Sequence, residues 1–137
     1  MWESIKDFFS KGQSINVLVI GDVMLDTYIR GTVDRISPEA PVQVLEWQGE
    51  DSAPGGAANV ACNLAALGCK VRLLGVVGSD SRGDELRGLL RAKGVDVSGL
   101  VLCHDRPTTH KTRVIAHNQQ VIRIDREDIS PLSEGAL

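Results

Sequence analysis

Short apolar runs alternate with helix-like segments along this chain, and that alternation limits the possible folds more than any other feature. Ile15–Ile20 (INVLVI) and Val71–Val77 (VRLLGVV) are rich in β-branched residues and too short for buried helices, so we expect two buried, central strands. A third strand is expected around Leu100–Cys103. Helices between successive strands place those strands in parallel. The sequence therefore predicts an α/β fold with a parallel sheet and flanking helices.

Helical patterns fill the stretches between these strands. The first helix is expected over Ala57–Leu67 and ends at Gly68, where a glycine commonly terminates a helix. The second begins after Asp80 or Ser81, either of which can cap it, and ends at Gly94. One face of this helix carries three leucines, Leu86, Leu89 and Leu90.

Two other segments have the composition of exposed strands. Residues 27–48 mix β-branched and polar residues with two prolines, which suits short exposed strands or hairpins rather than a sheet centre. Residues 111–124 alternate apolar and polar side chains around a turn near His117 and Asn118. We expect a flap from the first segment and a hairpin from the second, paired with each other.

The two ends of the chain have helical features of their own. Apolar side chains recur at helical spacing from Trp2 to Phe9, which predicts a short amphipathic helix packed against the domain. Near the other end, Ser130 can act as an N-cap and Pro131 as the first helical residue. Native domains seldom finish in the first turn of a helix. We therefore expect residues 1–137 to be the amino-terminal part of one larger domain.

Composition argues against several classes of protein. The chain has 137 residues, of which 42% are hydrophobic and 24% charged, as in a soluble globular domain. Its net charge of −3 provides no basic surface for nucleic acid. No apolar run approaches the roughly 20 residues that cross a bilayer, and the first residues lack the features of a signal peptide. We expect a cytoplasmic protein without nucleic-acid or membrane partners.

The three cysteines, Cys62, Cys69 and Cys103, are odd in number and lack the C-x-x-C spacing of zinc sites and redox pairs. We expect buried, free thiols and no metal site. Cys62 and Cys69 share one face if the first helix extends that far.

A pair of glycines, Gly55 and Gly56, stands directly ahead of the first helix. Glycines at such a place allow a positive φ and let a ligand approach main-chain N–H groups. Asn59, in the first helical turn, has both donor and acceptor groups for the vicinal hydroxyls of a sugar. A tight turn with close packing of the helix on the sheet explains the same residues equally well.

Asp26 ends the motif GDVMLD, which follows the first strand. In open α/β sheets, ligands bind beyond the carboxyl ends of the strands, so Asp26 is placed for hydroxyl recognition. A solvated acidic loop is one alternative, and an acid–base pair of Asp22 with Asp26 is another.

The predicted hairpin gathers polar side chains that suit an anionic, hydroxyl-rich ligand. An ordinary charged hairpin face is the alternative, and these residues considered alone favour it. The side chains are Lys111, Arg113, Asn118, Gln119 and Gln120.

Three stretches together resemble the amino-terminal part of the ribokinase-like (PfkB) sugar kinases. They are residues 19–44 (VIGDVMLDTYIRGTVDRISPEAPVQV), 54–68 (PGGAANVACNLAALG) and 108–125 (TTHKTRVIAHNQQVIRID). The resemblance covers about residues 15–130. Within the family, ISPEAPV and RVIAHNQQVIRID are similar to the D-glycero-β-D-manno-heptose 7-phosphate kinases of lipopolysaccharide core (ADP-heptose) synthesis.

The resemblance implies a role for each of these groups. Asp26 would bind sugar hydroxyls, and Gly55, Gly56 and Asn59 would line the sugar pocket. The segments 27–48 and 111–124 would form a β-lid that closes over the sugar, excludes water and supplies a homodimer interface. The lid residues expected to reach the substrate or its phosphate are Lys111, Arg113, Asn118 and Gln120.

The resemblance also implies ATP and Mg²⁺ as cofactors of the intact kinase. The catalytic aspartate of this family lies in a late G-A-G-D motif, which this sequence lacks, and GVVGSD at residues 75–80 does not have the anion-hole form. We expect the catalytic residue beyond position 137 and no ATP binding or catalysis by this chain alone.

Three functions remain open from the sequence. The first is a truncated sugar kinase, and the second is a non-catalytic protein that binds sugar or dimerises through its lid. The third, a dinucleotide-binding module, is weakened because no G-x-G-x-x-G follows the first strand. In a truncated sheet, one edge and one helix layer would face water, so we also expect aggregation or dimerisation through exposed surfaces.

Overall fold

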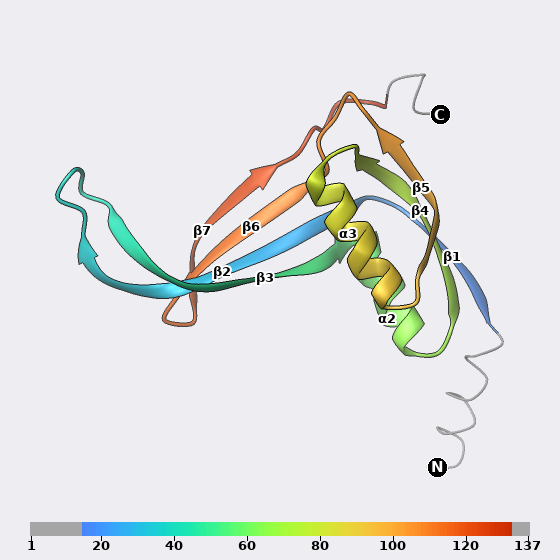
Figure 1. The fold of residues 1–137 in the computed structure, drawn as a ribbon, viewed down its shortest axis with the longest axis horizontal. Coiled ribbons are helices and arrows are strands. Elements are labelled where there is room, and N and C mark those ends of the chain that lie inside the picture. The colour runs from blue at the N-terminus through green and yellow to red at the C-terminus, as the bar shows by residue number, and fades with distance from the viewer. Residues whose placement is uncertain (1–14, 133–137) are drawn as a thin grey trace, which may run out of the picture.

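The computed structural model describes residues 15–132, so the expected helix from Trp2 to Phe9 lies outside the described residues. The body of the molecule is a three-stranded parallel sheet in the order β1-β4-β5 (Figure 1). Its parallel pairing confirms the prediction from the sequence. The strands are β1 (Asn16–Ile20), β4 (Lys70–Gly78) and β5 (Asp96–Cys103).

The prediction that β1 is a buried, central strand was wrong for the described residues. There, β4 is the central strand and β1 forms an edge. Leu18 and Ile20 of β1 are 56% and 66% exposed. They lie on the sheet face opposite the two helices, whereas Val19 packs against the core. Apolar patterning identified the strand, but a strand is buried on both sides only when a layer covers each face.

Two helices cover the other face of the parallel sheet, as predicted. α2 (Ala57–Ala66) ends before Gly68, whose φ is 92°, and α3 (Ser81–Ala92) ends before Gly94, whose φ is 78°. Asp80 is the N-cap of α3 and accepts a hydrogen bond of 2.9 Å from the Gly83 N–H. The helix ends therefore follow from local capping residues.

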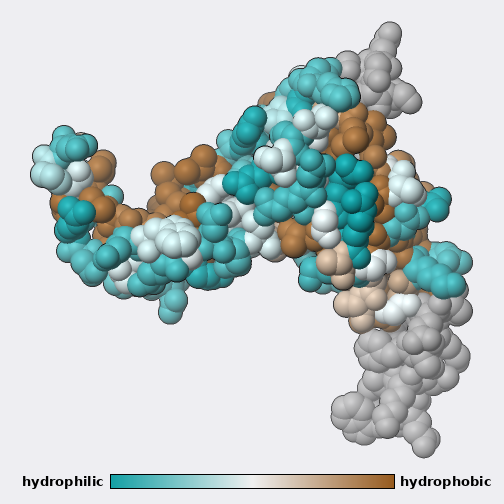
Figure 2. Space-filling view, in the orientation of Figure 1, coloured by the Kyte–Doolittle hydropathy of each residue, from teal (hydrophilic) through white to brown (hydrophobic). Residues whose placement is uncertain are grey.

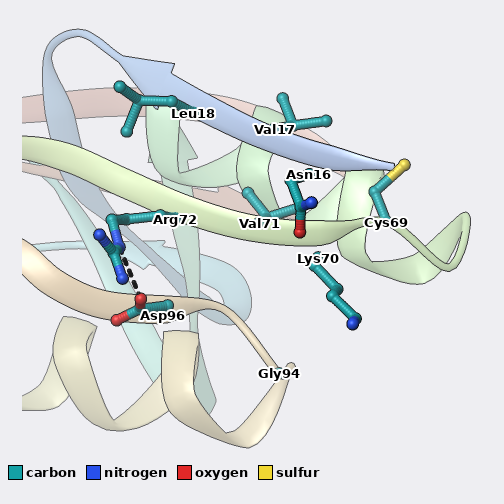
Figure 3. A pocket seen from close by; sticks show the side chains of 9 residues that line it. All are labelled: Asn16, Val17, Leu18, Cys69, Lys70, Val71, Arg72, Gly94 and Asp96. Carbon is teal, nitrogen blue, oxygen red and sulfur yellow. Dashed lines mark hydrogen bonds and ion pairs between the residues drawn. The ribbon is translucent and has the colours of Figure 1, made fainter. Parts of the chain in front are cut away.

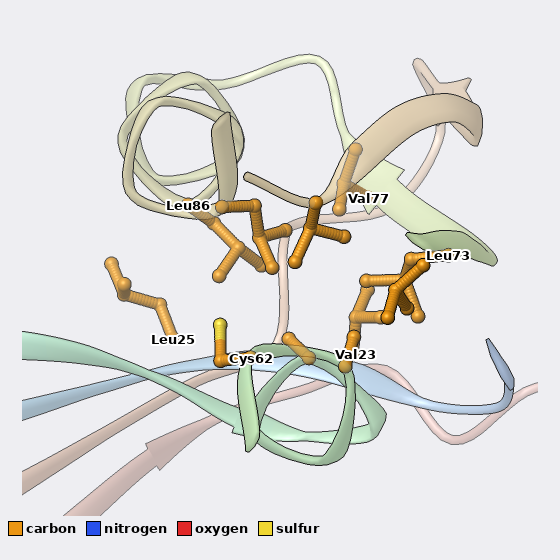
Figure 4. Packing of buried hydrophobic residues seen from close by; sticks show 11 residues of the cluster. Val23, Leu25, Cys62, Leu73, Val77 and Leu86 are labelled. Carbon is orange, nitrogen blue, oxygen red and sulfur yellow. The ribbon is translucent and has the colours of Figure 1, made fainter. Parts of the chain in front are cut away.

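The hydrophobic core lies between these helices and the sheet (Figure 4). Leu73 of β4, Leu86 of α3 and Leu25 from the start of β2 are fully buried. Cys62 packs among them, and all three cysteines are free thiols. Cys69 follows the end of α2 and is half-buried, so the helix does not extend far enough for the two thiols to share one of its faces.

A second, four-stranded sheet projects from this body (Figure 1), and we refer to it as the lid sheet. Its order is β3-β2-β6-β7, in which β2 pairs parallel with β6 and the other pairs are antiparallel. The flap and the hairpin expected from the sequence are thus paired with each other. The strands are β2 (Val23–Ile36), β3 (Gln43–Gly56), β6 (His110–Ala116) and β7 (Gln119–Arg126).

Two strands of the lid sheet are longer than the short strands expected. β2 and β3 have 14 residues each, and two register shifts accommodate their curvature. The turn between β6 and β7 falls at His117 and Asn118, as predicted, and both have a positive φ, 48° and 65°. The helix expected from Ser130 would lie mostly outside the described residues, which end at Leu132 without helical structure.

The face of the parallel sheet away from α2 and α3 carries apolar side chains without a covering helix in residues 15–132. Hydrophobic surface lies along this side of the molecule and on part of the lid sheet, while the surface over α3 is largely hydrophilic (Figure 2). We call these side chains the open sheet face: Leu18, Ile20, Leu74, Val76 and Val101.

Candidate functional site

The pairing of β2 with the end of β3 brings two of the sequence motifs together. Met24 is opposite Gly55, and Asp26 is opposite Ala53. A Cβ atom built on Gly55 would lie 2.5 Å from Asp26 Oδ2 and 2.7 Å from Met24 Cγ. Gly55 is buried. This position therefore requires glycine because two side chains of the neighbouring strand occupy the space of a Cβ.

Gly56 has the positive φ expected of the glycine pair, and Gly55 does not. With φ 57° and ψ −133°, Gly56 ends β3 and is the N-cap of α2, without a side-chain hydrogen bond. The Ala57 N–H donates to the Asp22 carbonyl at 2.8 Å, which fixes the start of the helix. Asn59 is exposed in the first turn of α2. The backbone conformation that needs a glycine thus occurs at one residue of the pair rather than at both.

One face of the lid sheet carries charged side chains that pair with one another, and we call it the charged lid face. The shortest of these ion pairs joins Arg113 Nη1 of β6 to Asp26 Oδ1 of β2 at 2.6 Å. Arg30 Nε and Asp51 Oδ1 form another at 3.1 Å. Because side chains alternate along strands, all of these charges lie on the same side as Asp26. The remaining members are Lys111, Arg123, Asp125 and Glu127.

Lys111 pairs with two carboxylates at the end of β7. Its Nζ lies 3.0 Å from Asp125 Oδ2 and 3.0 Å from Glu127 Oε2. These hydrogen bonds raise the pKa of Lys111. The bonds from Lys111 and Arg123 in turn lower the pKa of Asp125. The cation is therefore partnered within the lid sheet in this structure.

Asn118 and Gln120 lie toward the far end of the β6–β7 hairpin. Lys111 is opposite Asp26, whereas Gln120 is opposite Ile115, and Asn118 is in the turn. At roughly 3.3 Å per residue, four positions along β6 correspond to about 13 Å. The structure thus groups Asp26, Gly55, Lys111 and Arg113, and it holds Asn118 and Gln120 apart from them. Gln119 begins β7 beside the same turn.

A cavity of about 810 Å³ opens beside this group, at the carboxyl ends of the parallel strands. Asp22 and Met24 line it, but Asp26 and the glycine pair do not. The side chain of Met24 separates the cavity from Gly55 and Gly56, since it lies against both. The other walls include four residues of the open sheet face, namely Ile20, Leu74, Val76 and Val101, together with Arg106, Pro107, Thr109, residues 127–130 and Leu132.

A second pocket, of about 620 Å³, lies at the opposite end of the parallel strands (Figure 3). Arg72 Nε and Asp96 Oδ2 form an ion pair of 2.7 Å there. The Ser98 backbone N–H and Arg72 lower the pKa of Asp96 to about 2. Ligands of open α/β sheets bind at the carboxyl ends of strands, so this pocket is the weaker candidate.

Sequence reasoning missed a buried polar junction at the base of the lid sheet. Thr108, which is 2% exposed, donates from Oγ1 to Asp80 Oδ1 at 2.7 Å and accepts from the Gly78 N–H at 3.0 Å. The Thr108 N–H also donates to Asp80 Oδ2 at 3.1 Å. Burial opposes the charge on Asp80, but these bonds outweigh it and lower its pKa. The signal was present in GVVGSD, which serves here as a helix cap and lid anchor.

A second polar group missed by sequence reasoning lies on the other side of β2 from Asp26. His110 Nε2 is 2.9 Å from Thr27 Oγ1, and Thr27 Oγ1 is 3.0 Å from Ser52 Oγ. Thr27 is 2% exposed. Burial and the nearby charge of Arg82 lower the pKa of His110. These residues join three lid strands next to α3.

Two kinds of feature are absent from the described residues. Within residues 15–132, no group of three or more His, Cys, Asp or Glu side chains is arranged to hold a metal ion. No helix in the same part of the chain has the length and apolar character needed to cross a bilayer.

Comparisons with known proteins agree with this architecture. The family model described as pfkB family carbohydrate kinase matches residues 14–137. The chain is 51% identical over 133 residues to the bifunctional protein HldE of Geobacter metallireducens, and 53% identical over 133 residues to that of Desulfatibacillum aliphaticivorans. These matches cover 97% and 96% of this chain. They cover 27% of each relative, so the chain spans about a quarter of their length.

Solved structures share the fold. A carbohydrate kinase from Agrobacterium tumefaciens superposes with a TM-score of 0.63 at 26% identity, covering 81% of this chain and 35% of that one. Arabidopsis thaliana ribokinase, complexed with ribose and ATP, superposes with a TM-score of 0.64 at 20% identity and the same coverage. The second likeness, at this low identity, concerns the fold alone.

Proposed function

Because this chain belongs to the pfkB family of carbohydrate kinases, we propose that it forms the sugar-binding part and the lid of a heptose 7-phosphate kinase. The intact kinase transfers the γ-phosphoryl group of ATP to the anomeric hydroxyl of D-glycero-D-manno-heptose 7-phosphate, in the synthesis of ADP-heptose for lipopolysaccharide. The observation that carries the proposal is the position of Asp26, beside Gly55 and on the same lid face as Lys111.

Sugar binding is supported by the hydrogen-bonding groups of Asp26, on β2, and Asn59, in the first turn of α2. The Asp26 carboxylate can accept hydrogen bonds from two hydroxyls, and Asn59 can both donate and accept. Gly56, directly before α2, has no side chain to cover the main chain there. Carboxylate and amide groups next to exposed main chain suit vicinal hydroxyls of a sugar ring.

Preference for a phosphorylated sugar is supported by a cation of the charged lid face. Lys111 lies on β6 opposite Asp26 and on the same side of the sheet, two residues before Arg113. We assign to Lys111 the closure over the 7-phosphate end of the substrate. Asn118 and Gln120, at the far end of the hairpin, reach that end only if the lid sheet bends over the sugar.

The phosphoryl donor is assigned to the rest of the intact kinase. ADP and ATP are present in solved ribokinases of this fold, from Cryptococcus neoformans and Arabidopsis thaliana. We propose that ATP and Mg²⁺ bind outside this segment, together with the catalytic aspartate. The segment itself would hold the acceptor, orient its hydroxyl and exclude water as the lid closes.

We also propose a homodimer formed through the lid sheet. The side opposite the charged lid face carries Ile29, Val114, Ile122 and Ile124, which we call the apolar lid face. Ile122 and Ile124 are 54% and 55% exposed. An exposed sheet surface of this composition gains free energy when a second copy covers it.

Calorimetric titration of the purified chain tests the sugar-binding proposal. We expect D-glycero-D-manno-heptose 7-phosphate to bind and Asp26→Asn to lose at least about tenfold in affinity, since a carboxylate acceptor is exchanged for an amide. Asp34→Asn, the same change at an exposed position farther along β2, is the matched control. A folded chain that binds no heptose phosphate would contradict the proposal.

A further inference from the structure

We propose that Arg113 is a positioning residue: it orients the Asp26 carboxylate for the sugar hydroxyls, and it is not itself the ligand of the substrate's phosphate. This inference rests on the proposed function and deepens it. Neighbouring lid residues then serve different ends of one substrate, the hydroxyls at one end and the phosphate at the other.

The first support is the direction in which Arg113 reaches. In the pairing of β2 with β6, Asp26 is opposite Lys111, and Tyr28 is opposite Arg113. Arg113 nevertheless reaches diagonally across to Asp26, with 2.6 Å between Nη1 and Oδ1. The two side chains are only 22% and 15% exposed. Such a short, sheltered, charge-assisted hydrogen bond restricts the rotation of the carboxylate.

The second support is that Tyr28 holds the guanidinium in place. The Arg113 Cζ atom lies 5.4 Å from the centre of the Tyr28 ring, within the range of a cation–π contact. Arg30 lies over the same ring at 5.9 Å, but its charge is paired with Asp51. The hydrogen bond to Asp26 raises the pKa of Arg113, so the guanidinium stays charged. Arg113 is thus fixed from two positions of β2.

The third support comes from the other oxygen of the carboxylate. Asp26 Oδ2 lies close to Gly55, 2.5 Å from the position that a Cβ on that residue would take. Arg113 binds Oδ1, so Oδ2 is the oxygen that faces the glycine segment leading into α2. In our proposal, Oδ2 is the acceptor for a sugar hydroxyl, and its direction depends on Arg113.

The fourth support is the contrast with Lys111. Although Lys111 is opposite Asp26 in the sheet, its ammonium group binds Asp125 and Glu127 toward the edge strand β7. The two neighbouring cations of β6 therefore pair in opposite directions: Arg113 with β2, and Lys111 with carboxylates at the end of β7. If Arg113 moved away to bind a phosphate, the sheltered carboxylate of Asp26 would lose its partner. If Lys111 moved instead, the two carboxylates left behind, Asp125 and Glu127, would be closer to solvent.

The test compares two ligands that differ only by the phosphate, D-glycero-D-manno-heptose 7-phosphate and D-glycero-D-manno-heptose. Both are titrated into the full chain and into Arg113→Gln, Arg113→Lys and the control Arg87→Gln. Arg87 is on α3, outside the lid sheet, and its side chain pairs with Asp84 and is 25% exposed, close to the 22% of Arg113. Circular dichroism verifies that each variant is folded.

We expect Arg113→Gln to weaken the binding of both sugars by the same factor, about tenfold, because a positioned carboxylate serves the hydroxyls whether or not a phosphate is present. Arg113→Lys should fall between the wild type and Arg113→Gln for both ligands, since lysine keeps the charge without the planar guanidinium. Arg87→Gln should change neither affinity by more than about twofold.

Three results would overturn the inference. Arg113→Gln could weaken only the 7-phosphate, which would make Arg113 a phosphate ligand, or it could weaken neither sugar. Wild-type chain that binds only the phosphorylated sugar would also count against it, because an oriented Asp26 should bind the hydroxyls alone. If the folded wild-type chain binds neither sugar, the proposed function itself fails, and that result is distinct from the other three.

Discussion

The carboxylate of Asp26 occupies the space in which a side chain at Gly55 would lie, with Oδ2 2.5 Å from the position of a Cβ on that residue. The two residues belong to different motifs of the sequence, and the β2–β3 pairing makes them neighbours. Their fit means that the acid can keep its present position only while residue 55 has no side chain.

Gly55→Ala should therefore destabilise the chain and weaken heptose phosphate binding. The added methyl group displaces Asp26 and Met24, an overpacking effect of about 1–3 kcal/mol in the free energy of unfolding. Urea denaturation and calorimetric titration measure the two effects. Gly49→Ala is the matched control, because a Cβ on Gly49 meets no atom within 4 Å. Equal affinity and stability of the two variants would contradict the prediction.

Thr108→Val should lower the free energy of unfolding, while Thr108→Ser should retain most of it. Valine keeps the shape but loses the hydroxyl that bonds to Asp80 and Gly78. A buried polar group left without its partner costs about 1–3 kcal/mol. Chemical denaturation of the two variants measures the difference, and a valine variant as stable as the serine variant would show that the junction adds nothing.

The stability of the chain should fall as pH decreases below about 6.5. Burial, with Arg82 nearby, lowers the pKa of folded His110 below its ordinary value. Between the two pKa values, the unfolded chain binds a proton that the folded chain does not, so acid favours unfolding there. Above pH 7 both states hold a neutral imidazole, and the effect is absent.

His110→Gln isolates this effect from the other groups that titrate. Denaturation midpoints of the wild type and the variant should be measured between pH 7.5 and 5. Glu85, Arg126 and Asp26 also act on His110, and they are the same in both proteins. A difference between the two midpoints that does not change with pH would refute the prediction.

The two apolar surfaces should contribute differently to self-association. Replacing Ile122 and Ile124 by lysine should abolish a discrete dimer, if the apolar lid face forms it, because four charges would meet in one interface. Replacing Leu18 and Ile20 by lysine should instead reduce aggregation through the open sheet face. Size-exclusion chromatography with light scattering distinguishes the two. A dimer that survives the lid substitutions but not the sheet substitutions would reverse the assignment.

Most secondary structure could be predicted because its signals are local. The glycines after α2 and α3, the cap at Asp80 and the turn at His117 and Asn118 each act within a few residues. The exposure of β1 could not be predicted, because a strand can have the same apolar sequence whether one or both of its faces are covered. The lengths of β2 and β3 were also missed, because mixed composition conceals long curved strands.

The sequence by itself determined the order of strands and helices, the helix ends and the membership of Asp26 and the glycine pair in separate motifs. Only the tertiary structure decided that Asp26 meets Gly55 on one side and Arg113, 87 positions away, on the other. The reason is that β2 pairs with β3 and β6 at once, and the register of both pairs depends on which side chains are buried across the whole sheet. Periodicity along one segment contains no information about the strand that will lie beside it.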